Sequence, residues 1–281
     1  MTVEYASPRL VSDASECFFY HVMDLPGVGV VGGQWDLRDT VDDYLGRFDF
    51  RGKRVLDVGA ASGFLTFEIE KRSAKEVVSF DLGRDASWDI VPRGGLSAVA
   101  RGEESKRRHL ERLVNAYWLA HRLLGSSAKA YYGDVYELPE ALGPFDVVVL
   151  GAILLHLRDP FRALQAVSRL STDAIIVTDL YFASELPVMR FVPSGDSETS
   201  DAWWLISDAC LTQMLGVLGF EVRSRTHADH LKVLGGQPRP VTFSTHVARR
   251  RRDGEAERRL DRVSQDAAPV VGRDDDRDPR P

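Results

Sequence analysis

Two aspartates, Asp57 and Asp81, are the residues whose type and spacing best predict a ligand site. Asp57 lies in the run Val-Leu-Asp-Val-Gly-Ala-Ala-Ser-Gly at residues 55–63. The apolar residues of this run predict a buried strand, residues 59–63 a tight turn, and residues 64–71 the helix that follows. Asp81 ends a second apolar run, at the point where nucleotide-binding folds hold a ribose diol. The pattern therefore predicts the first β-α-β unit of a nucleotide-binding α/β fold.

The charge of Asp57 discriminates between the ligands that such a turn can hold. Backbone N–H groups at a helix N-terminus favour a pyrophosphate, but a neighbouring carboxylate repels one. The same carboxylate attracts an ammonium or a sulfonium, by about 4 kcal/mol at about 4 Å and an effective dielectric of about 20, before desolvation. The pattern therefore favours S-adenosylmethionine over NAD as the cofactor. The alternatives are that Asp57 caps a helix or braces the loop, and that Gly59 and Gly63 serve the turn alone.

The segments around this motif alternate between strand and helix patterns. Seven segments predict strands, at residues 54–58, 76–81, 128–132, 145–150, 174–179, 220–226 and 241–248. Helices are expected at 64–71, 105–124, 160–170 and 207–218, and before the motif at 8–23 and from Asp36 or Asp39 to residue 47. This order predicts a doubly wound, Rossmann-like α/β fold with a seven-stranded, mostly parallel sheet, a C-terminal antiparallel hairpin and an N-terminal helical cover.

The composition divides the chain into three expected parts. We expect residues 1–50 to form an N-terminal helical cap, residues 51–248 the cofactor-binding domain, and residues 249–281 a disordered charged tail. Two long irregular stretches inside the domain, residues 82–104 and 181–201, have the length of lids or binding loops.

Bulk properties narrow the class of protein further. A chain of 281 residues with 44% hydrophobic residues can bury one full core. Its net charge of −6 makes a nucleic-acid partner unfavourable without excluding a local basic patch. Cys17 and Cys210 form no metal-binding pattern, so neither a zinc site nor a disulfide framework is expected. Without an eighteen-residue apolar run or a signal-peptide pattern, we expect a cytoplasmic protein with no membrane span.

Together these motifs resemble those of class I S-adenosylmethionine-dependent methyltransferases. The resemblance rests on residues 55–63, Asp81, Gly133-Asp134-Val135 and the run Phe-Asp-Val-Val-Val-Leu at 145–150, and it covers residues 50–250. Ala61 stands where many members of this family have glycine. Its methyl group would narrow the room beside the methionine moiety.

The resemblance implies roles for the motif residues. Asp57 would orient the methionine ammonium, and Asp81 would accept hydrogen bonds from both ribose hydroxyls. Asp134 would bind the adenine amino group, while the N–H of Val135 faces a ring nitrogen. The remaining expected cofactor contacts are Gly59, Ala60, Ser62, Gly63, Leu82 and, at the reactive end, Gly151 and Ala152. As alternatives, Asp81 simply ends a strand and Asp134 belongs to an ordinary Gly-Asp turn.

Methyl transfer from a sulfonium is a direct displacement, so no metal and no protein nucleophile is expected. A general base is needed only if the acceptor must first lose a proton. His156 is the best-placed candidate, and a histidine that braces the following helix is the alternative. His227 and His230 are further candidates. Arg158 and Asp159 are expected to form a local charge pair.

The acceptor is expected to be a small molecule. Trp88, Trp203 and Trp204 lie in or near the irregular stretches, where they would line an aromatic acceptor pocket or serve as core anchors. Trp118 lies on a predicted helix and is expected in the core. Neither the acceptor atom (oxygen, nitrogen or carbon) nor the oligomeric state can be read from the sequence, and secondary metabolism is one setting for such an enzyme.

Three segments are also similar to the tRNA wobble-uridine carboxymethyltransferase branch of this family: residues 20–26, 152–160 and 202–207. That branch uses carboxy-S-adenosylmethionine, whose added carboxylate needs cationic or hydroxyl partners. This chain has Leu155 where the branch carries a tyrosine, and no counterpart of its basic N-terminal contacts. We therefore expect a relative that uses ordinary S-adenosylmethionine. A tRNA-modifying methyl- or carboxymethyltransferase is the first alternative, followed by an NAD-dependent oxidoreductase and a non-catalytic binding module.

Overall fold

The computed structural model describes residues 3–83, 96–194, 202–233 and 237–251, and the side chains of residues 96–103 are not described. Residues Met1–Arg250 form one compact unit. The expected charged tail falls almost entirely outside the described residues, although Arg249 and Arg250 belong to the last strand.

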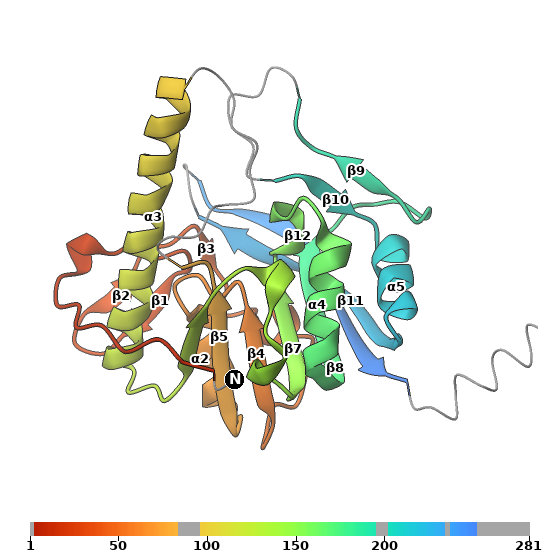
Figure 1. Ribbon diagram of the computed structural model, residues 1–281, viewed down its shortest axis with the longest axis horizontal. Coiled ribbons are helices and arrows are strands. Elements are labelled where there is room, and N and C mark those ends of the chain that lie inside the picture. Colours follow the sequence, from red (N-terminus) through yellow and green to blue (C-terminus); the bar gives the residue numbers. More distant parts are fainter. Residues whose placement is uncertain (1–2, 84–95, 195–201, 234–236, 252–281) are drawn as a thin grey trace, which may run out of the picture. The chain divides into compact units, whose positions relative to one another are not determined.

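An eight-stranded sheet forms the centre of this unit, in the order β3-β11-β12-β8-β7-β4-β5-β6 (Figure 1). The strands from β6 to β8 are parallel, and β12, β11 and β3 are each antiparallel to their neighbours. Their bounds are β3 (Trp35–Asp36), β4 (Arg54–Val58), β5 (Glu76–Asp81), β6 (Lys129–Tyr132), β7 (Phe145–Gly151), β8 (Ser171–Leu180), β11 (Phe220–Lys232) and β12 (Arg239–Arg250). The predicted Rossmann-like α/β fold with its C-terminal hairpin is confirmed.

Helices cover both faces of the sheet because consecutive strand residues point to opposite sides. Val55 of β4 packs with α1 (Val41–Tyr44), α2 (Phe64–Lys71) and α3 (Leu96–Leu123). Leu56 and Val58 of the same strand pack with α4 (Pro160–Leu170) and α5 (Asp208–Val217), which lie side by side (Figure 1). A residue on β4 therefore faces either the layer of α1–α3 or the layer of α4 and α5.

The N-terminal segment differs from the expected helical cover. The helix predicted at residues 8–23 is wrong: only a 3₁₀ turn, η1 (Ala14–Glu16), forms there, capped by Asp13. The following chain is extended because other elements bind its backbone. The N–H of Phe18 donates to the carbonyl of Arg112 on α3, and the N–H of Tyr20 donates to the hydroxyl of Ser62. The segment then forms the hairpin of β1 (Met23–Leu25) and β2 (Gly29–Val31).

The central sheet has one strand more than predicted, and two helices have other bounds. Asp36 or Asp39 is expected to cap a helix, but Trp35 and Asp36 pair with Lys232 and Leu231 and add an eighth strand to the expected seven. The helix there is only α1, which ends before two residues of positive φ, Gly46 and Arg47. Helix α3 begins at Leu96 rather than at 105, so part of the expected irregular stretch is helical. The second stretch contains β9 (Met189–Phe191), which pairs antiparallel with β10 (Trp204–Ile206) just beyond the stretch.

Candidate functional site

The carboxyl ends of β4, β5 and β7 meet at one edge of the sheet. Val58 on β4 is paired with Phe80 on β5 and with Leu150 on β7, so the residues that follow these strands lie side by side. The chain turns sharply after β4, where the N–H groups of Gly59 and Ala60 donate to the carbonyl of Phe80 at 2.8 and 3.2 Å. Open α/β sheets bind ligands at this edge.

The turn between β4 and α2 needs glycine at two positions. Gly59 and Gly63 have φ values of +79° and +89°, a backbone region that other L-residues rarely adopt. A Cβ on Gly63 would lie 2.5 Å from the ring of Phe67 and 2.8 Å from that of Tyr117. Ala61 also has a positive φ, of +50°. The turn keeps its left-handed shape at Ala61 despite the extra methyl group.

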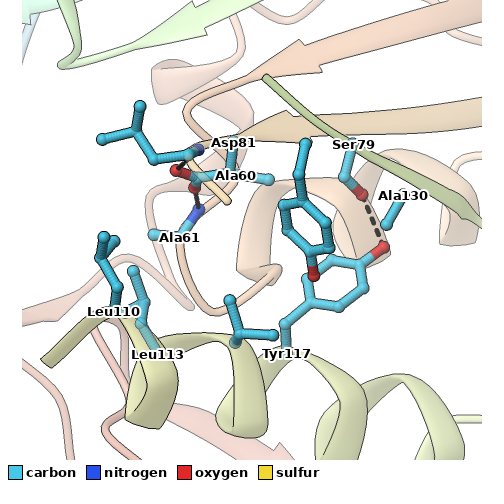
Figure 2. Close-up of a pocket in the computed structure, with 11 residues that line it drawn as sticks. Ala60, Ala61, Ser79, Asp81, Leu110, Leu113, Tyr117 and Ala130 are labelled. Atoms are coloured by element: carbon cyan, nitrogen blue, oxygen red, sulfur yellow. Dashed lines mark hydrogen bonds between the residues drawn. The ribbon is translucent and has the colours of Figure 1, made fainter. Parts of the chain in front are cut away.

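Asp81 closes this turn from the neighbouring strand. Its Oδ2 accepts the N–H of Ala61 at 2.5 Å, and its Oδ1 accepts the N–H of Leu82 at 2.6 Å. Enclosure by protein raises the pKa of the Asp81 carboxyl, and these two hydrogen bonds oppose the rise. Figure 2 shows Asp81 in the wall of a hollow between the turn and α3. The hollow is lined by Ala60, Ala61, Ser79, Asp81, Leu82, Leu110, Leu113, Val114, Tyr117, Ala130 and Tyr132.

Asp57 is completely buried beneath the turn. Its Oδ2 accepts the hydroxyl of Thr66 at 2.6 Å, whereas its Oδ1 has no hydrogen-bond partner among the described residues. Burial raises the pKa of Asp57 to about 7; the Thr66 hydrogen bond lowers it and the charge of Asp81 adds to the rise. A buried carboxylate oxygen without a partner is destabilising, and a cation beside it would remove that penalty.

Two tyrosines and one aspartate with no role predicted from the sequence lie near Gly151, at the end of β7. Tyr44 packs against Gly151 so closely that a Cβ there would lie 3.4 Å from the Tyr44 hydroxyl. Burial raises the pKa of Tyr44 well above its usual value, and Tyr20, Asp179 and Asp57 raise it further. Asp179 ends a parallel strand much as Asp81 does, which is a signal that the sequence already contained. Tyr20 and Tyr44 carry no such signal, because only the fold brings them to this edge.

Asp179 holds the loop that carries His156. It is buried, and its two oxygens accept the N–H groups of Leu180 at 2.8 Å and Leu155 at 3.2 Å. Burial raises the pKa of Asp179 to about 7, against the effect of these hydrogen bonds. Leu155 and the partly exposed His156 belong to the 3₁₀ turn η4 (Leu154–His156).

Two of the four tryptophans singled out in the sequence pack against this loop. The N–H of Trp203 donates to the carbonyl of Leu155 at 2.7 Å, and the indole Nε1 of Trp204 donates to the carbonyl of Arg158 at 3.0 Å. Trp203 is buried, as is Trp118 on α3, whereas Trp88 lies outside the described residues.

The remaining predicted contacts have local partners. Asp134 is exposed, and its Oδ1 accepts the N–H of Tyr136 at 2.8 Å, which caps the 3₁₀ turn η2 (Val135–Glu137). Val135 is buried. The hydroxyl of Ser62 accepts the N–H of Tyr20 at 3.0 Å and so anchors the N-terminal segment. Ala152 follows β7 with a φ of +51°, and its N–H donates to the carbonyl of Thr178.

The two further candidate histidines lie on β11, away from the turn. His230 is buried against Tyr44, with its Nδ1 2.8 Å from the hydroxyl of Thr40, and burial lowers its pKa. The Nε2 of His227 lies 2.7 Å from a carboxyl oxygen of Asp208 at the start of α5. Asp159, expected to pair with Arg158, caps α4 by accepting the N–H of Arg162.

Two kinds of feature are absent from the part of the chain that the structure describes. Within it, no group of three or more His, Cys, Asp or Glu side chains is arranged to hold a metal ion. Among the helices of the described residues, none combines the length and apolar character needed to span a membrane.

Comparison with known proteins supports the fold assignment. No protein-family model matches the chain. An uncharacterized methyltransferase of Schizosaccharomyces pombe is 26% identical over 137 residues, which are 49% of this chain and 42% of that protein. The match thus spans less than half the length of this relative.

Solved structures resemble the chain over more of its length. The N-terminal domain of EvdMO1, crystallised in the presence of SAH (S-adenosylhomocysteine) and D-fucose, superposes with a TM-score of 0.50 at 19% identity, over 85% of this chain and 94% of that one. A candidate RNA methyltransferase from Pyrococcus horikoshii superposes with a TM-score of 0.49 at 16% identity, over 75% and 84%. Together with the sheet order, the superposition on the EvdMO1 domain supports a Rossmann-like fold.

Proposed function

We propose that the protein is an S-adenosylmethionine-dependent methyltransferase that acts on a small-molecule acceptor. The observation that carries this proposal is the buried carboxyl of Asp57, whose Oδ1 has no partner among the described residues. It lies under a glycine turn that is closed by Asp81. A cofactor with an ammonium would supply the missing partner, whereas a pyrophosphate would meet two carboxylates.

The residues present fit this cofactor. Asp57 would hold the methionine ammonium, Asp81 the ribose hydroxyls, and Asp134 with Val135 the adenine. When bound, the cofactor supplies an electrophilic methyl group on a sulfonium. The chain's own task is to align the acceptor with the S–CH₃ bond and to exclude water, which can supply several kcal/mol by proximity alone. If the acceptor must lose a proton, His156 on η4 would take it.

The charges near the reactive end favour ordinary S-adenosylmethionine over its carboxylated form. The groups that act electrostatically on the Tyr44 hydroxyl are the phenol of Tyr20 and the carboxyls of Asp179 and Asp57. When ionised, the carboxyls of Asp179 and Asp57 would repel an added carboxylate on the cofactor and attract a sulfonium, whereas the Tyr20 phenol carries no charge. A carboxymethyltransferase would have to bind that carboxylate through a cation or through the hydroxyls of Tyr20 and Tyr44, and no cation is among the described groups that act on Tyr44.

Calorimetry with S-adenosylmethionine and with S-adenosylhomocysteine tests this function directly. We expect both to bind with a stoichiometry of one, and binding of neither would refute the proposal. The cofactor-loaded protein should then be screened against phenols, amines and activated carbon acids, with the product mass distinguishing methyl from carboxymethyl transfer. Salt-dependent binding of tRNA with a steep slope would favour the RNA-modifying alternative.

A further inference from the structure

A continuous chain of buried hydrogen bonds joins Asp57 to the hollow beside α3. The hydroxyl of Thr66 on α2 lies 2.6 Å from Asp57 Oδ2 and 3.2 Å from the hydroxyl of Ser79 on β5. The Ser79 hydroxyl lies 2.6 Å from that of Tyr117 on α3. All four side chains are buried, and Ser79 and Tyr117 also line the hollow (Figure 2).

The hydrogen bonds that join Asp57, Thr66, Ser79 and Tyr117 must all point in the same direction. Each hydroxyl has a single proton to donate. If Asp57 is ionised, Thr66 donates to Asp57, so Ser79 must donate to Thr66 and Tyr117 must donate to Ser79. If Asp57 carries a proton on Oδ2, the three hydroxyls can reverse, and the proton of Tyr117 then points away from Ser79. The two charge states of Asp57 thus correspond to two orientations of the same chain.

We propose that Thr66, Ser79 and Tyr117 are positioning residues that set the charge of Asp57, so that binding of a cationic cofactor group at Asp57 releases a proton through this chain. The step balances: Asp57 passes its proton to Thr66, each hydroxyl passes its own proton onward, and Tyr117 delivers one proton to water in the hollow. Every hydroxyl is neutral before and after. The inference rests on the proposed function, since it takes the ligand of Asp57 to be the cofactor ammonium.

The surroundings of Asp57 favour a proton in the empty site and its loss on binding. The titratable groups that interact with it are Asp81 on β5, Tyr44 on α1 and Tyr117 on α3, and none of these is cationic. His21 of the N-terminal segment packs on Phe64 of α2, and burial lowers its pKa to about 3, so it is neutral. Because burial places the pKa of Asp57 near 7, an arriving ammonium shifts its protonation within the physiological range.

Calorimetric titration of the full-length protein with S-adenosylhomocysteine tests the proposed proton release from Asp57. Titrations from pH 5.5 to 9, each in two buffers of different ionisation enthalpy, count the protons released. We expect release approaching one proton at pH 6 and close to none at pH 8.5, with affinity rising as the pH increases through 7. Asp57→Asn should abolish the release.

Single substitutions distinguish proton release through Thr66, Ser79 and Tyr117 from a role of these residues in packing alone. Thr66→Val removes the hydrogen bond to Asp57, so the pH of half-maximal proton release should rise by half a unit or more. Thr66→Ser keeps a hydroxyl, so this midpoint should return to the wild-type value. Tyr117→Phe should shift it in the same direction but by less. Tyr5→Phe is a matched control, since the Tyr5 hydroxyl contacts Arg54 at the opposite end of β4. If Thr66→Val fails to fold, Tyr117→Phe and Thr66→Ser still decide the matter.

The outcomes distinguish the two proposals. Binding without proton release at any pH, or an unshifted midpoint in both Thr66→Val and Tyr117→Phe, would overturn the relay and leave the proposed function intact. Failure of both S-adenosylhomocysteine and S-adenosylmethionine to bind at every pH would instead overturn the proposed function.

Discussion

The three carboxyls at the edge of the sheet differ in how their oxygens are satisfied. Asp81 and Asp179 each accept two backbone N–H groups, so both stabilise the surrounding backbone without a ligand. Asp57 accepts one hydroxyl and keeps one oxygen without a partner among the described residues. Asp57 is therefore the carboxyl most dependent on a ligand, whereas Asp81 and Asp179 also hold the turn and the η4 loop.

Replacing Asp81 should weaken cofactor binding strongly. In Asp81→Asn the amide nitrogen would face either the N–H of Ala61 or that of Leu82, and one acceptor for the ribose hydroxyls would be lost. We expect affinity for S-adenosylmethionine to fall at least tenfold, or about 1.4 kcal/mol, measured by calorimetry. Asp229→Asn is the control, because that carboxylate accepts the hydroxyl of Thr242 on the C-terminal hairpin. Unchanged affinity in Asp81→Asn would reject the ribose role.

Among the elements, the turn between β4 and α2 is constrained by its backbone and by α3. Gly63 begins α2 in the left-handed region, and its missing side chain makes room for the rings of Phe67 and Tyr117. The relay residue Tyr117 is thus packed directly against the turn. A side chain at position 63 would displace the ring of Tyr117, the last residue of the hydrogen-bond series that begins at Asp57.

Gly63→Ala should separate the effect of crowding from that of backbone strain. Gly52 has a similar φ of +69° and nothing within 4 Å of the position that a Cβ would take, so Gly52→Ala introduces only the left-handed strain, about 1–2 kcal/mol. Gly63→Ala adds to this strain the displacement of two aromatic rings, for a further loss of about 1–3 kcal/mol. Urea denaturation of both variants measures the difference, and equal losses would show that the rings accommodate the methyl group freely.

For the whole molecule, the buried carboxyls and the buried histidines have opposite effects on how the free energy of unfolding changes with pH. Burial raises the pKa values of Asp57 and Asp179 to about 7, so between pH 4 and 7 the folded state binds more protons than the unfolded state, and stability falls as the pH rises. Burial lowers the pKa of His21 to about 3 and that of His246 to about 4, so between pH 4 and 6.5 stability rises with pH. The two effects oppose each other over this window.

Removing the carboxyls of Asp57 and Asp179 should therefore leave the effect of the histidines on stability unopposed. For the variant Asp57→Asn/Asp179→Asn without ligand, we expect the free energy of unfolding to rise between pH 4.5 and 6.5 more steeply than for the wild type. Each removed carboxyl accounts for a difference of about 1.4 kcal/mol per pH unit at most. Urea titrations at several pH values measure both slopes, and parallel slopes would contradict the raised pKa values. Asp229→Asn again serves as the control.

The sheet could be predicted from the sequence because its strands are local patterns. Runs such as residues 54–58 and 145–150 carry apolar residues on both faces, and this marks buried parallel strands whatever surrounds them. The N-terminal segment could not be predicted in this way. Its backbone is bound by distant partners, Arg112 on α3, Ser62 in the turn and Leu231 on β11, so tertiary contacts override a weak helical preference.

The α/β fold, the glycine turn and the strand-end positions of Asp57 and Asp81 follow from the sequence alone, since each depends on residues close together in the chain. The environment of those side chains follows from the tertiary structure. The sequence pattern makes Asp57 a charge that selects a cationic ligand; the fold makes it a buried carboxyl on a hydrogen-bond chain from Tyr117, sixty residues away. Burial and hydrogen bonding set the charge of a carboxyl, and both arise from elements that meet only when the chain folds.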